Sequence, residues 1–524
     1  MPVRTIVLLA VGVFCLTGGL MVRRRLPLFR PRVGSGRVAR QWATERDRVS
    51  FSTDGLFIAS PSLSARRTLG ARQRDALTAG GAALLVGLVL APHVVLLGLV
   101  AFCTVAYVAS MVVRLWLFKI SLGGTALIKI PDSEALGTPD EVFDSYTVMV
   151  PVFREPEVMS SLVEHLRHLD YPAERLQILL LAEADDSATI AAARVAIGAA
   201  ADLRILIVPP GGPRTKPKAL NYGLTHATGT FLTIFDAEDR PDPLQLRRAA
   251  IALSRLPPEV ACLQARLGFF NGGQNVITRW FQVEYSMWFR QMLPGLSKLR
   301  VPIPLGGTSN HFRKEVLLDL GAWDPYNVTE DADLGVRLSR AGYRSEVMDS
   351  LTLEEANSDF VNWAKQRSRW YKGYLQTFLV HMRDFRESQR LLGTRRLLFL
   401  MLFVGGTPLM AMVNPIFWTL TVVWFVVKPA WLMAVFPAPL YFLGLFCWLA
   451  GNFLFTFTCM LEAIEVDDSL FVAALLTPVY WVMMSVAAYK ALVQVFFAPA
   501  YWEKTRHGLA KAVVGATAPA RPTP

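Results

Sequence analysis

The sequence is poor in charged residues and in cysteine. Charged side chains make up 18% of the 524 residues, whereas a soluble globular chain carries about 25%, and hydrophobic residues make up 53%. This balance excludes a disordered regulator or a small disulfide-stapled scaffold and disfavours a purely cytosolic enzyme. The five cysteines include no CxxC pair, and four of them lie in apolar stretches. They therefore indicate packing rather than a disulfide framework or a zinc site.

Two common phosphate-binding signatures are also missing. No GxGxxG follows the first expected strand, and no GxxxxGK[ST] occurs in the chain. Neither a dinucleotide-binding fold nor a P-loop is therefore expected to hold phosphates. The formal net charge is +12. We assign this basic excess to loops beside apolar spans, where Lys and Arg keep those loops on the cytoplasmic side, and we expect no nucleic acid partner.

The N-terminal part contains two apolar regions. Residues 5–22 are apolar and precede three arginines, so we interpret residues 1–22 as a transmembrane anchor. Residues 23–76 then read as a basic cytoplasmic linker near the anionic membrane surface. Residues 77–118 are nearly uncharged until Arg114 and are long enough for two spans with a turn near Pro92–His93.

The C-terminal part is again apolar. Three runs, 397–427, 431–461 and 470–498, predict transmembrane helices over residues 396–500, with breaks at the prolines they contain. Together with the N-terminal regions they give an expected total of six to eight spans. Residues 501–524 form a short basic tail, expected to be cytoplasmic or interfacial. The chain is thus predicted to be a multi-pass protein of the cell inner membrane.

Between these regions, residues 119–395 have the composition of a soluble domain. Apolar runs separated by helical stretches predict a mostly parallel sheet covered by helices on both faces. The expected strands are 146–152, 177–182, 204–208, 230–235 and 260–265, and the expected helices are 156–169, 187–200, 217–227 and 243–255. Ligands of such sheets bind beyond the carboxyl ends of the strands, so functional residues are expected there.

Carboxylates follow three of these strands. Glu155 comes after the first and Glu183 and Asp185 after the second, while Asp236 and Glu238 stand two positions apart after the fourth. Crowded carboxylates repel one another unless a cation lies between them, and hard divalent cations share oxygen ligands with phosphates. Asp236 and Glu238 therefore predict a metal–diphosphate site. Lys218, in the string Thr215–Asn221, is the candidate for offsetting diphosphate charge.

Two further motifs lie downstream. The first is the string Gly306–Asn310. It is followed by Thr329, Glu330 and Asp331 at the start of an expected helix over 330–341. A carboxylate at such a junction can take a proton from a hydroxyl nucleophile. Farther on, Gln366, Arg369 and Trp370 fall on one face of a helix, with Trp363 one turn earlier. Arg suits a diphosphate and the face of Trp stacks on a sugar ring. An amphipathic interfacial helix would show the same pattern.

Taken together, these strings resemble the membrane-embedded glycosyltransferases of family 2, the group that contains cellulose, hyaluronan, chitin and poly-N-acetylglucosamine synthases. The resemblance covers about residues 75–505, and Trp502–Gly508 is similar to the end of the bacterial branch. It implies an α/β GT-A (Rossmann-like) cytoplasmic domain, with a short mixed extension of its sheet, inserted between transmembrane helices. Two strings depart from the family pattern: Glu238 replaces the second Asp of the DxD motif, and Glu-Ala-Asp-Asp at 183–186 replaces Asp-Asp-Gly. No cyclic-di-GMP receptor domain follows the spans.

The resemblance also implies roles for individual residues. Asp331 is the expected general base, next to Glu330 and Thr329, and Asp236 and Glu238 are the expected ligands of Mg²⁺ or Mn²⁺. The expected donor contacts are Glu155, Glu183, Asp185, Lys218, Asp236, Gln366 and Arg369. The expected acceptor contacts are Gly307, Thr308, Ser309, Asn310 and Trp370.

The leading hypothesis is an inverting polysaccharide synthase. It would transfer a hexose, from UDP-glucose or UDP-N-acetylglucosamine, to a growing β-linked glycan and extrude the product through the membrane, with accessory secretion subunits as possible partners. Polar residues Asn414, Asn452 and Glu462 are candidates for the path. A non-processive transferase with a lipid-linked acceptor is the first alternative, and a receptor or scaffold with an inactive domain is the second. GDP-mannose ranks behind the two UDP-sugars as donor.

Overall fold

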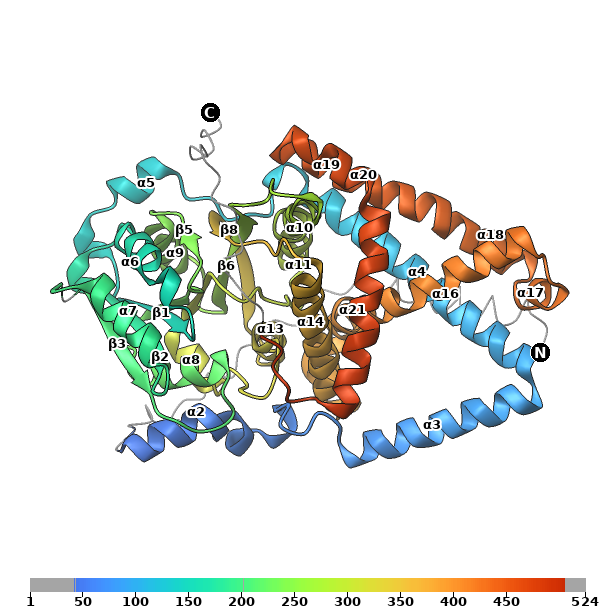
Figure 1. Cartoon of the computed structure of the whole chain (residues 1–524), viewed down its shortest axis with the longest axis horizontal. Helices are drawn as coiled ribbons and strands as arrows, with labels where there is room; N and C mark the ends of the chain where they lie inside the picture. The colour runs from blue at the N-terminus through green and yellow to red at the C-terminus, as the bar shows by residue number, and fades with distance from the viewer. Residues whose placement is uncertain (1–41, 43, 201, 505–524) are drawn as a thin grey trace.

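The computed structural model describes residues 42, 44–200 and 202–504. It contains a mixed α/β domain beside a group of long apolar helices (Figure 1). The predicted anchor at 1–22, part of the linker at 23–76 and most of the tail at 501–524 lie outside the described residues. The span count of six to eight therefore stays a prediction.

The α/β domain is built on one eight-stranded sheet with the order β3-β2-β1-β4-β7-β6-β8-β5. The first four of these strands in space are parallel, β7 is antiparallel to both of its neighbours, and β8 runs parallel to β6. The bounds are β1 Tyr146–Val152, β2 Leu176–Glu183, β3 Leu203–Val208, β4 Phe231–Ile234, β5 Arg240–Pro241, β6 Val260–Phe269, β7 Asn310–Arg313 and β8 Arg344–Glu354. All five predicted strands are present, and the predicted mixed α/β fold of GT-A type is confirmed.

Helices cover both faces of the sheet, which explains why its central strands are apolar at nearly every position. Val148 and Val150 of β1 point into a cluster with helices α6, α7 and α9, while Met149 points to the opposite face and packs with α8. The bounds of these helices are α6 Met159–Arg167, α7 Ser187–Ile197, α8 Lys216–Leu224 and α9 Gln245–Arg255. The four helices predicted in this region are therefore confirmed.

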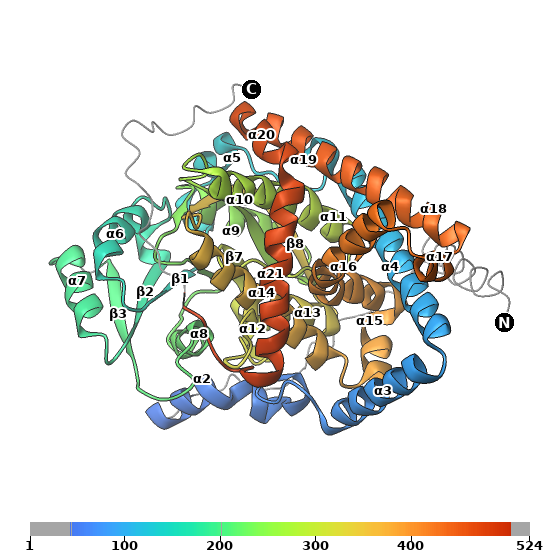
Figure 2. The ribbon, with the colours of Figure 1, turned by 45° about the vertical axis from the view of Figure 1, so that its right-hand side comes forward.

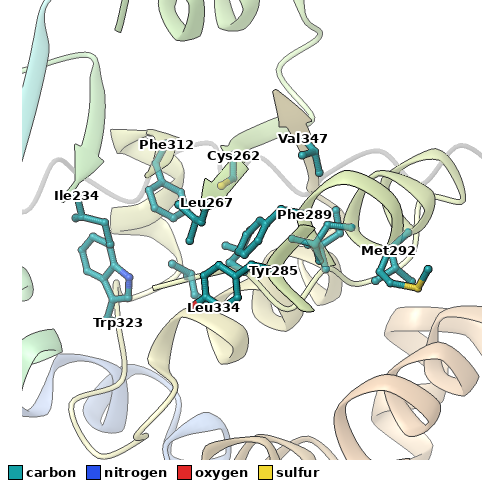
Figure 3. Close-up of a cluster of buried hydrophobic side chains, with 14 of the residues drawn as sticks. Ile234, Cys262, Leu267, Tyr285, Phe289, Met292, Phe312, Trp323, Leu334 and Val347 are labelled. Atoms are coloured by element: carbon teal, nitrogen blue, oxygen red, sulfur yellow. The ribbon is translucent and has the colours of Figure 1, made fainter. Parts of the chain in front are cut away.

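The mixed half of the sheet packs against a second set of helices. Phe312 of β7, Val347 of β8 and Leu267 of β6 meet Tyr285 and aromatic neighbours in a buried cluster (Figure 3). The helices on this side are α10 Val276–Ser286, α11 Leu293–Lys298, α12 Lys314–Asp319 and α13 Glu330–Arg340. Helix α13 begins at the first residue of the helix predicted over 330–341.

Four helical segments in the described part of the chain are long and apolar enough to cross a bilayer. They are Pro92–Gly124, Phe385–Val426, Ala438–Ala463 and Thr477–Phe497. The helices that form them are α4 Pro92–Ser121, α15 Phe385–Leu400, α16 Gly406–Val426, α18 Ala438–Phe446, α19 Asn452–Val466 and α21 Thr477–Phe497. These segments are candidate membrane spans by length and composition, and they lie before and after the α/β domain in the chain.

The predicted turn near Pro92–His93 is a sharp change of direction. Helix α3, Ala71–Leu90, ends one residue before α4 begins, and the two helices diverge from Ala91 (Figure 1). Pro92 occupies the first turn of α4, where its missing N–H leaves no hydrogen bond unmade. The remaining apolar helices are the short α17 Ala430–Val435 and α20 Phe471–Leu475.

Helix α14, Phe360–His381, joins the two parts of the molecule. It lies alongside α21 in both views (Figures 1 and 2), and its other side faces the sheet domain. The N-terminal helix α2, Glu45–Ala59, packs against α8, and α5, Asp132–Gly137, packs against α9. Helix α14 therefore connects the α/β domain to the apolar helices. Helix α2, which precedes the domain in the chain, packs against it.

Candidate active site

The carboxyl ends of β1, β2 and β4 meet at one edge of the sheet and open into a cavity of about 670 Å³. Most of the residues predicted from sequence line it. They are Glu155, Glu183, Asp236, Glu238, Gly307, Thr308, Thr329, Glu330, Asp331, Gln366, Arg369 and Trp370. One cavity thus brings together the candidate donor, metal, base and acceptor residues, although their individual roles stay predictions.

Four predicted residues do not line this cavity. Asp185 forms an exposed ion pair with Arg214 at 2.6 Å. Ser309 and Asn310 are buried behind the floor of the cavity, where the Ser309 hydroxyl lies 2.7 Å from Thr352 Oγ1 and Asn310 Nδ2 donates to the Gly306 carbonyl at 2.6 Å. The fourth is Lys218, which is almost fully buried. Ser309 and Asn310 therefore fix the position of the floor without facing a ligand.

Lys218 lies on the buried side of helix α8 and makes its polar contacts there. Its Nζ donates to the Pro209 carbonyl at 2.8 Å and lies 3.2 Å from the Glu183 carboxylate. The cavity instead receives Lys216, which pairs with Asp236 and donates to the Gly307 carbonyl at 2.7 Å. The reason is helical geometry: positions two residues apart point about 200° away from each other. The sequence contains both lysines, but it does not show which of them the helix turns toward the cavity.

Negative charge dominates the end of β4. Asp236 and Glu238 line the cavity together with Glu354, which the longer β8 brings to the same point. Burial, and then the charges of Asp239, Asp236 and Glu238, raise the pKa of Glu354 well above its usual range. Lys216 lowers that pKa only in part. Burial and crowding among the carboxyl groups at this edge thus favour the protonated, neutral form of Glu354.

Asp239, the residue after Glu238, is not among the residues that line the cavity. It is buried, accepts a hydrogen bond from the Asp236 backbone N–H at 2.8 Å and another from the Thr308 hydroxyl. Burial and the neighbouring carboxylates raise the pKa of Asp239 well above its usual range. Asp239 therefore links the loop of Asp236 and Glu238 to the floor of the cavity.

The donor set fits a hard divalent cation. No cluster of three or more His, Cys, Asp or Glu side chains among residues 42, 44–200 and 202–504 is arranged as a metal site. Asp236 and Glu238 offer two carboxylates that line the cavity. Mg²⁺ and Mn²⁺ commonly bind through one or two carboxylates and complete their coordination with water and phosphate oxygens. The residues present suit such an ion bound together with a diphosphate.

Glu330 and Asp331 stand at the first turn of α13 and line the same cavity. Burial, and then Asp331, raise the pKa of Glu330 to about 8, while burial raises the pKa of Asp331 to about 6 against the effect of the Ala332 N–H. That N–H donates to Asp331 Oδ1 at 2.7 Å, so Asp331 Oδ2 is left toward Gly307. Of these two neighbouring carboxyl groups, Asp331 therefore has the lower pKa and ionises first as the pH rises, which fits its predicted role as the base.

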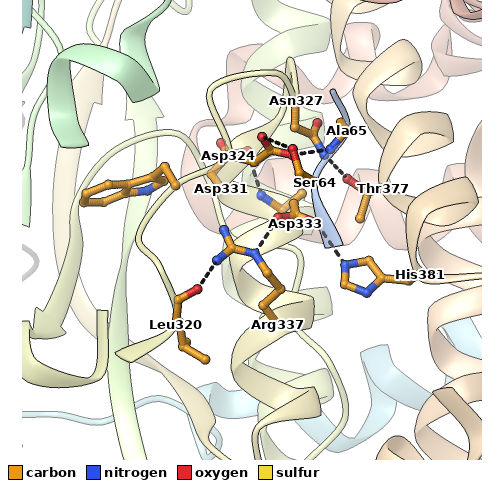
Figure 4. A network of polar contacts seen from close by, with 12 residues as sticks. Ser64, Ala65, Leu320, Asp324, Asn327, Asp331, Asp333, Arg337, Thr377 and His381 are labelled. Carbon is orange, nitrogen blue, oxygen red and sulfur yellow. Dashed lines mark hydrogen bonds and ion pairs between the residues drawn. The ribbon is translucent and has the colours of Figure 1, made fainter. Parts of the chain in front are cut away.

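The segment before Asp331 is tied to helix α14. Asn327 Nδ2 donates to Thr377 Oγ1 at 2.9 Å, Val328 N–H donates to Gln376 Oε1 at 3.2 Å, and Thr329 packs against Gly373. Figure 4 shows this contact beside the deeper network of the same two helices. The position of the candidate base is therefore set by the helix that carries Arg369 and Trp370.

A buried charge network lies one turn below. Asp333 of α13 accepts from Arg337 Nε at 2.7 Å and lies 2.9 Å from Nε2 of His381, at the end of α14 (Figure 4). Burial raises the pKa of Asp333, but Arg337 and His381 more than offset this and leave it below its usual range. The ionised Asp333 carboxylate thus connects α13 to α14 through its contact with His381.

Helix α14 presents Gln366, Arg369 and Trp370 to the cavity, as the sequence predicts, while Trp363 is buried away from it. The Trp370 ring lies near Phe281 and Tyr285, with ring centroids 5.8 and 6.2 Å away. Between these rings, Arg367 forms a bidentate ion pair with Glu284 at 2.7 and 2.5 Å. Trp370 is therefore held rigidly on one face and borders the cavity with the other.

The segment that follows α21 returns to this cavity. Trp502 lies under the Arg369 guanidinium at 5.0 Å, and Lys504 Nζ donates to the Phe153 carbonyl at 2.6 Å. Lys504 also lies 3.9 Å from Glu155. The start of the predicted Trp502–Gly508 string thus borders the site, while residues 505–508 are outside the described residues.

The cavity continues between the apolar helices. Its lining there includes Tyr107, Ser110 and Arg114 of α4, Thr407 and Asn414 of α16, and Trp481 of α21. Of the polar residues predicted for a path, Asn414 lines it. Asn452 donates to the Trp448 carbonyl, and Glu462 is buried against Arg290, Ser286 and Gln291.

Comparison with known proteins agrees with this geometry. Residues 144–373 match the family described as "Glycosyltransferase like family 2". A probable glycosyltransferase, YdaM, of Bacillus subtilis is 22% identical over 246 residues, which are 47% of this chain and 58% of YdaM. Glucomannan 4-beta-mannosyltransferase 2 of Arabidopsis thaliana is 28% identical over 256 residues, 48% of this chain and 47% of that protein.

The chain therefore spans about half the length of the curated relatives it matches. Among solved structures, the mannosyltransferase PcManGT from Pyrobaculum calidifontis, in complex with GDP-Man and Mn²⁺, is similar with a TM-score of 0.49 and 19% identity. That similarity covers 77% of this chain and 99% of PcManGT. Over residues 144–373, the sequence match supports the resemblance to family 2 glycosyltransferases that the motifs indicate.

Proposed function

We propose that this chain, whose residues 144–373 form a family 2 glycosyltransferase domain, is an inverting membrane polysaccharide synthase. It transfers a hexose from a nucleotide sugar to a growing β-linked glycan and passes the product into the membrane helices. The observation that carries the proposal is the single cavity that joins Asp236, Asp331 and Trp370 and continues between α4, α16 and α21.

The donor occupies the edge of the sheet where β1, β2 and β4 end. Lys216 and Arg369 face the carboxylates of Asp236 and Glu330 there and supply positive charge for the diphosphate. Asp236 and Glu238 would hold Mg²⁺ or Mn²⁺, which neutralises charge on the departing nucleoside diphosphate. Glu155 and Glu183 lie farther along the same edge, on the side expected for the nucleoside.

The transfer is a single displacement. The acceptor hydroxyl oxygen forms a bond to the anomeric carbon, the bond from that carbon to the diphosphate oxygen breaks, and the configuration inverts. The hydroxyl proton passes to Asp331, whose carboxylate lines the same cavity as Asp236. The nucleoside diphosphate leaves toward the edge held by Lys216 and Arg369.

The acceptor sugar lies on Trp370, above the floor formed by Gly307 and Thr308. A Cβ atom at Gly307 would lie 3.2 Å from Asp331 Oδ2, so a glycine here keeps space for an acceptor hydroxyl beside the base. The transferred sugar is glucose, N-acetylglucosamine or mannose; the names of the plant mannosyltransferases among the relatives support mannose more than the sequence motifs do.

The location follows from the distribution of charge and apolar helices. Four candidate spans flank the α/β domain, and the sequence has a basic excess outside its apolar runs. Nucleotide sugars are made in the cytoplasm, so the proposal places the domain on the cytoplasmic side of the inner membrane. Accessory secretion subunits would receive the product on the other side.

A second candidate function is transfer to a lipid-linked acceptor without repeated extension. It uses the same donor edge and the same base. Arg114, a cation in the part of the cavity between the apolar helices, favours this candidate because a lipid-linked acceptor brings a phosphate to that depth.

The test uses the full chain in lipid with Mg²⁺ or Mn²⁺ and one radiolabelled UDP- or GDP-sugar at a time. High-molecular-weight product from one donor, absent with Asp331→Asn, supports the synthase. A short lipid-soluble product moves the assignment to the second candidate. If no nucleotide sugar is bound at all, the transferase proposal fails.

A further inference from the structure

Residues 60–66 lie outside the family match and pack against the chain just before the candidate base. The Ser64 hydroxyl donates to Asp324 Oδ1 at 3.1 Å, and the Ala65 N–H donates to Asp324 Oδ2 at 2.5 Å (Figure 4). A third donor, the Tyr326 N–H, lies 3.1 Å from Oδ1. The Asp324 side chain is fully buried, so its partners come in part from a segment 260 positions earlier in the sequence.

These donors stabilise the charged form of the Asp324 carboxyl group. Burial, and then the charge of Asp333, raise the pKa of Asp324 to about 6, whereas the N–H groups of Ala65 and Tyr326 and the charge of Arg337 act to lower it. A buried carboxylate that lacks hydrogen-bond donors is unfavourable. The contact with residues 64 and 65 therefore contributes to holding Asp324 in this position.

The residue that follows the end of helix α14 by two positions holds the same segment. Arg383 Nη1 donates to the Pro61 and Ser62 carbonyls at 3.2 and 2.8 Å, and Arg383 Nη2 donates to the Ser64 carbonyl at 3.0 Å. These bonds fix the backbone of the segment up to Ser64, the residue whose hydroxyl reaches Asp324. Residues 60–66 are therefore fixed between the end of α14 and the loop before the candidate base.

The residue before Asp324 is held as well. Asn221 Oδ1 accepts from the Trp323 N–H at 3.0 Å, and Asn221 Nδ2 donates to the Trp323 carbonyl at 2.9 Å. The same Nδ2 group donates to the Ser52 carbonyl of α2 at 3.3 Å. The N-terminal part of the described chain is thus bound to two consecutive residues of this loop, through Asn221 of α8 in one case and directly in the other.

Asp324 can act on the site only through the chain that follows it. It is not among the residues that line the cavity, whereas residues 328–331 are. The Asn327 N–H donates to the Asp324 carbonyl at 3.2 Å, and the Asn327 side chain is bound to Thr377 of α14. The loop is therefore held at its start by residues 64 and 65 and farther along by α14. A shift at either place would move the Asp331 carboxylate relative to the acceptor.

We propose that Asp324 is a positioning residue for the candidate base Asp331, and that Ser64 and Ala65 supply the contact that fixes it. The rate of transfer then depends on residues 60–66, although none of them lines the cavity. The inference rests on the proposed transferase function and adds to it a support for the base that lies outside residues 144–373.

The test compares Asp324→Asn and Ser64→Ala in the full chain in lipid. Asparagine keeps the size of the side chain, but its NH₂ group cannot accept from the donors that face it. Turnover at saturating donor is expected to fall about tenfold or more in Asp324→Asn and about threefold in Ser64→Ala, because a small displacement of a reacting group is costly in rate. The affinities for UDP and GDP, titrated with Mn²⁺, are expected to change less than about twofold, since the loop is altered and the donor edge is not.

Hydrogen–deuterium exchange supplies a readout that does not depend on turnover. The backbone amides of residues 325–333 are expected to exchange about threefold faster or more in both variants, while those of strands β1 and β4 keep their rates. Ser62→Ala is the matched control, because the Ser62 side chain is exposed and its carbonyl keeps the contact with Arg383. This control is expected to change turnover and exchange less than about twofold.

Unaltered turnover and unaltered exchange of residues 325–333 in folded Asp324→Asn would overturn the proposal. Lower turnover accompanied by faster exchange throughout the sheet and weaker nucleotide binding would also overturn it, because Asp324 would then support the whole domain rather than the base. If Asp324→Asn does not fold, Ser64→Ala decides by the same measurements. If the unaltered protein transfers no sugar, the transferase proposal fails separately, and exchange still decides whether residues 64 and 65 hold the loop.

Discussion

Gly373 of helix α14 lies directly against Thr329, two residues before the candidate base. A Cβ atom added at Gly373 would lie 2.7 Å from the Thr329 Cβ, with the remaining Thr329 side-chain atoms closer still. The helix that carries Arg369 and Trp370 and the loop that carries Asp331 therefore meet without room for a methyl group. Donor, base and acceptor positions depend on one another through this contact.

We expect Gly373→Ala to lower turnover at least tenfold, because the added methyl displaces the 327–331 segment from α14. Overpacking of this kind typically costs about 1–3 kcal/mol of stability, so Tm should fall as well. The control is Gly98→Ala in α4, where no atom lies within 4 Å of the added Cβ. Unchanged turnover in folded Gly373→Ala would contradict the coupling.

The two lysines of α8 should behave differently. Lys216→Ala is expected to weaken nucleoside diphosphate binding about tenfold or more with little change in Tm, because Lys216 faces the cavity. Lys218→Ala leaves Glu183 as a buried carboxylate without its cation, and losing one partner of a buried pair commonly costs about 3–5 kcal/mol. Thermal unfolding and nucleotide titration on both variants measure the contrast, and the reverse pattern would refute it.

Asp331→Asn should abolish turnover while leaving donor binding nearly intact. Loss of a positioned general base commonly costs about 10²–10⁴ in rate. Glu330→Gln provides the comparison: Glu330 is protonated at neutral pH, and glutamine has the same shape and no charge, so its loss should be less than tenfold. Rates at saturating donor, with donor affinity measured separately, decide between the two carboxylates.

The rate at saturating donor and metal should depend on pH through Asp331. Burial raises the pKa of Asp331 to about 6, and the base is active only when ionised. The rate should therefore be constant above about pH 7 and fall tenfold per pH unit well below 6, as protonation removes the base. A profile without this limb, recorded between pH 5 and 8, would exclude Asp331 as the group that takes the proton.

Removal of divalent metal should weaken nucleoside diphosphate binding as well as activity. Asp236 and Glu238 line the cavity together, so a diphosphate bound beside them without a cation is repelled by two carboxylates. Titration calorimetry with Mn²⁺ and with a chelator should show at least a tenfold difference in affinity. Asp236→Asn should remove that difference; equal affinities in the unaltered protein would argue against a metal-assisted site.

The parts of the fold that are apolar and regular could be predicted from the sequence. The five predicted strands are mainly apolar because helices cover both faces of the sheet. Strand β8 was missed because its side chains alternate between buried and partly exposed and include several charged residues. Because β8 was not predicted, the sequence gave no reason to expect Glu354 beside Asp236.

The site was predictable as a set of motifs but not as a set of contacts. The order of Asp236, Asp331 and Trp370 along the chain indicated one chemistry, and the structure brings all three to one cavity. The choice of Lys216 over Lys218 requires the phase of α8, which a short string does not define. The anchoring of Thr329 by Gly373 depends on a contact between segments that are 44 positions apart in sequence.

Asp239 has a consequence for changing the specificity of this site. Its carboxyl group accepts hydrogen bonds from the Asp236 backbone and from Thr308, so the metal loop and the acceptor floor share one buried group. Selection or engineering at position 308 for a different sugar will therefore alter metal affinity as well. Mutational effects at 308 and 236 will be epistatic, and libraries that vary Thr308 without varying position 239 will sample mainly inactive combinations.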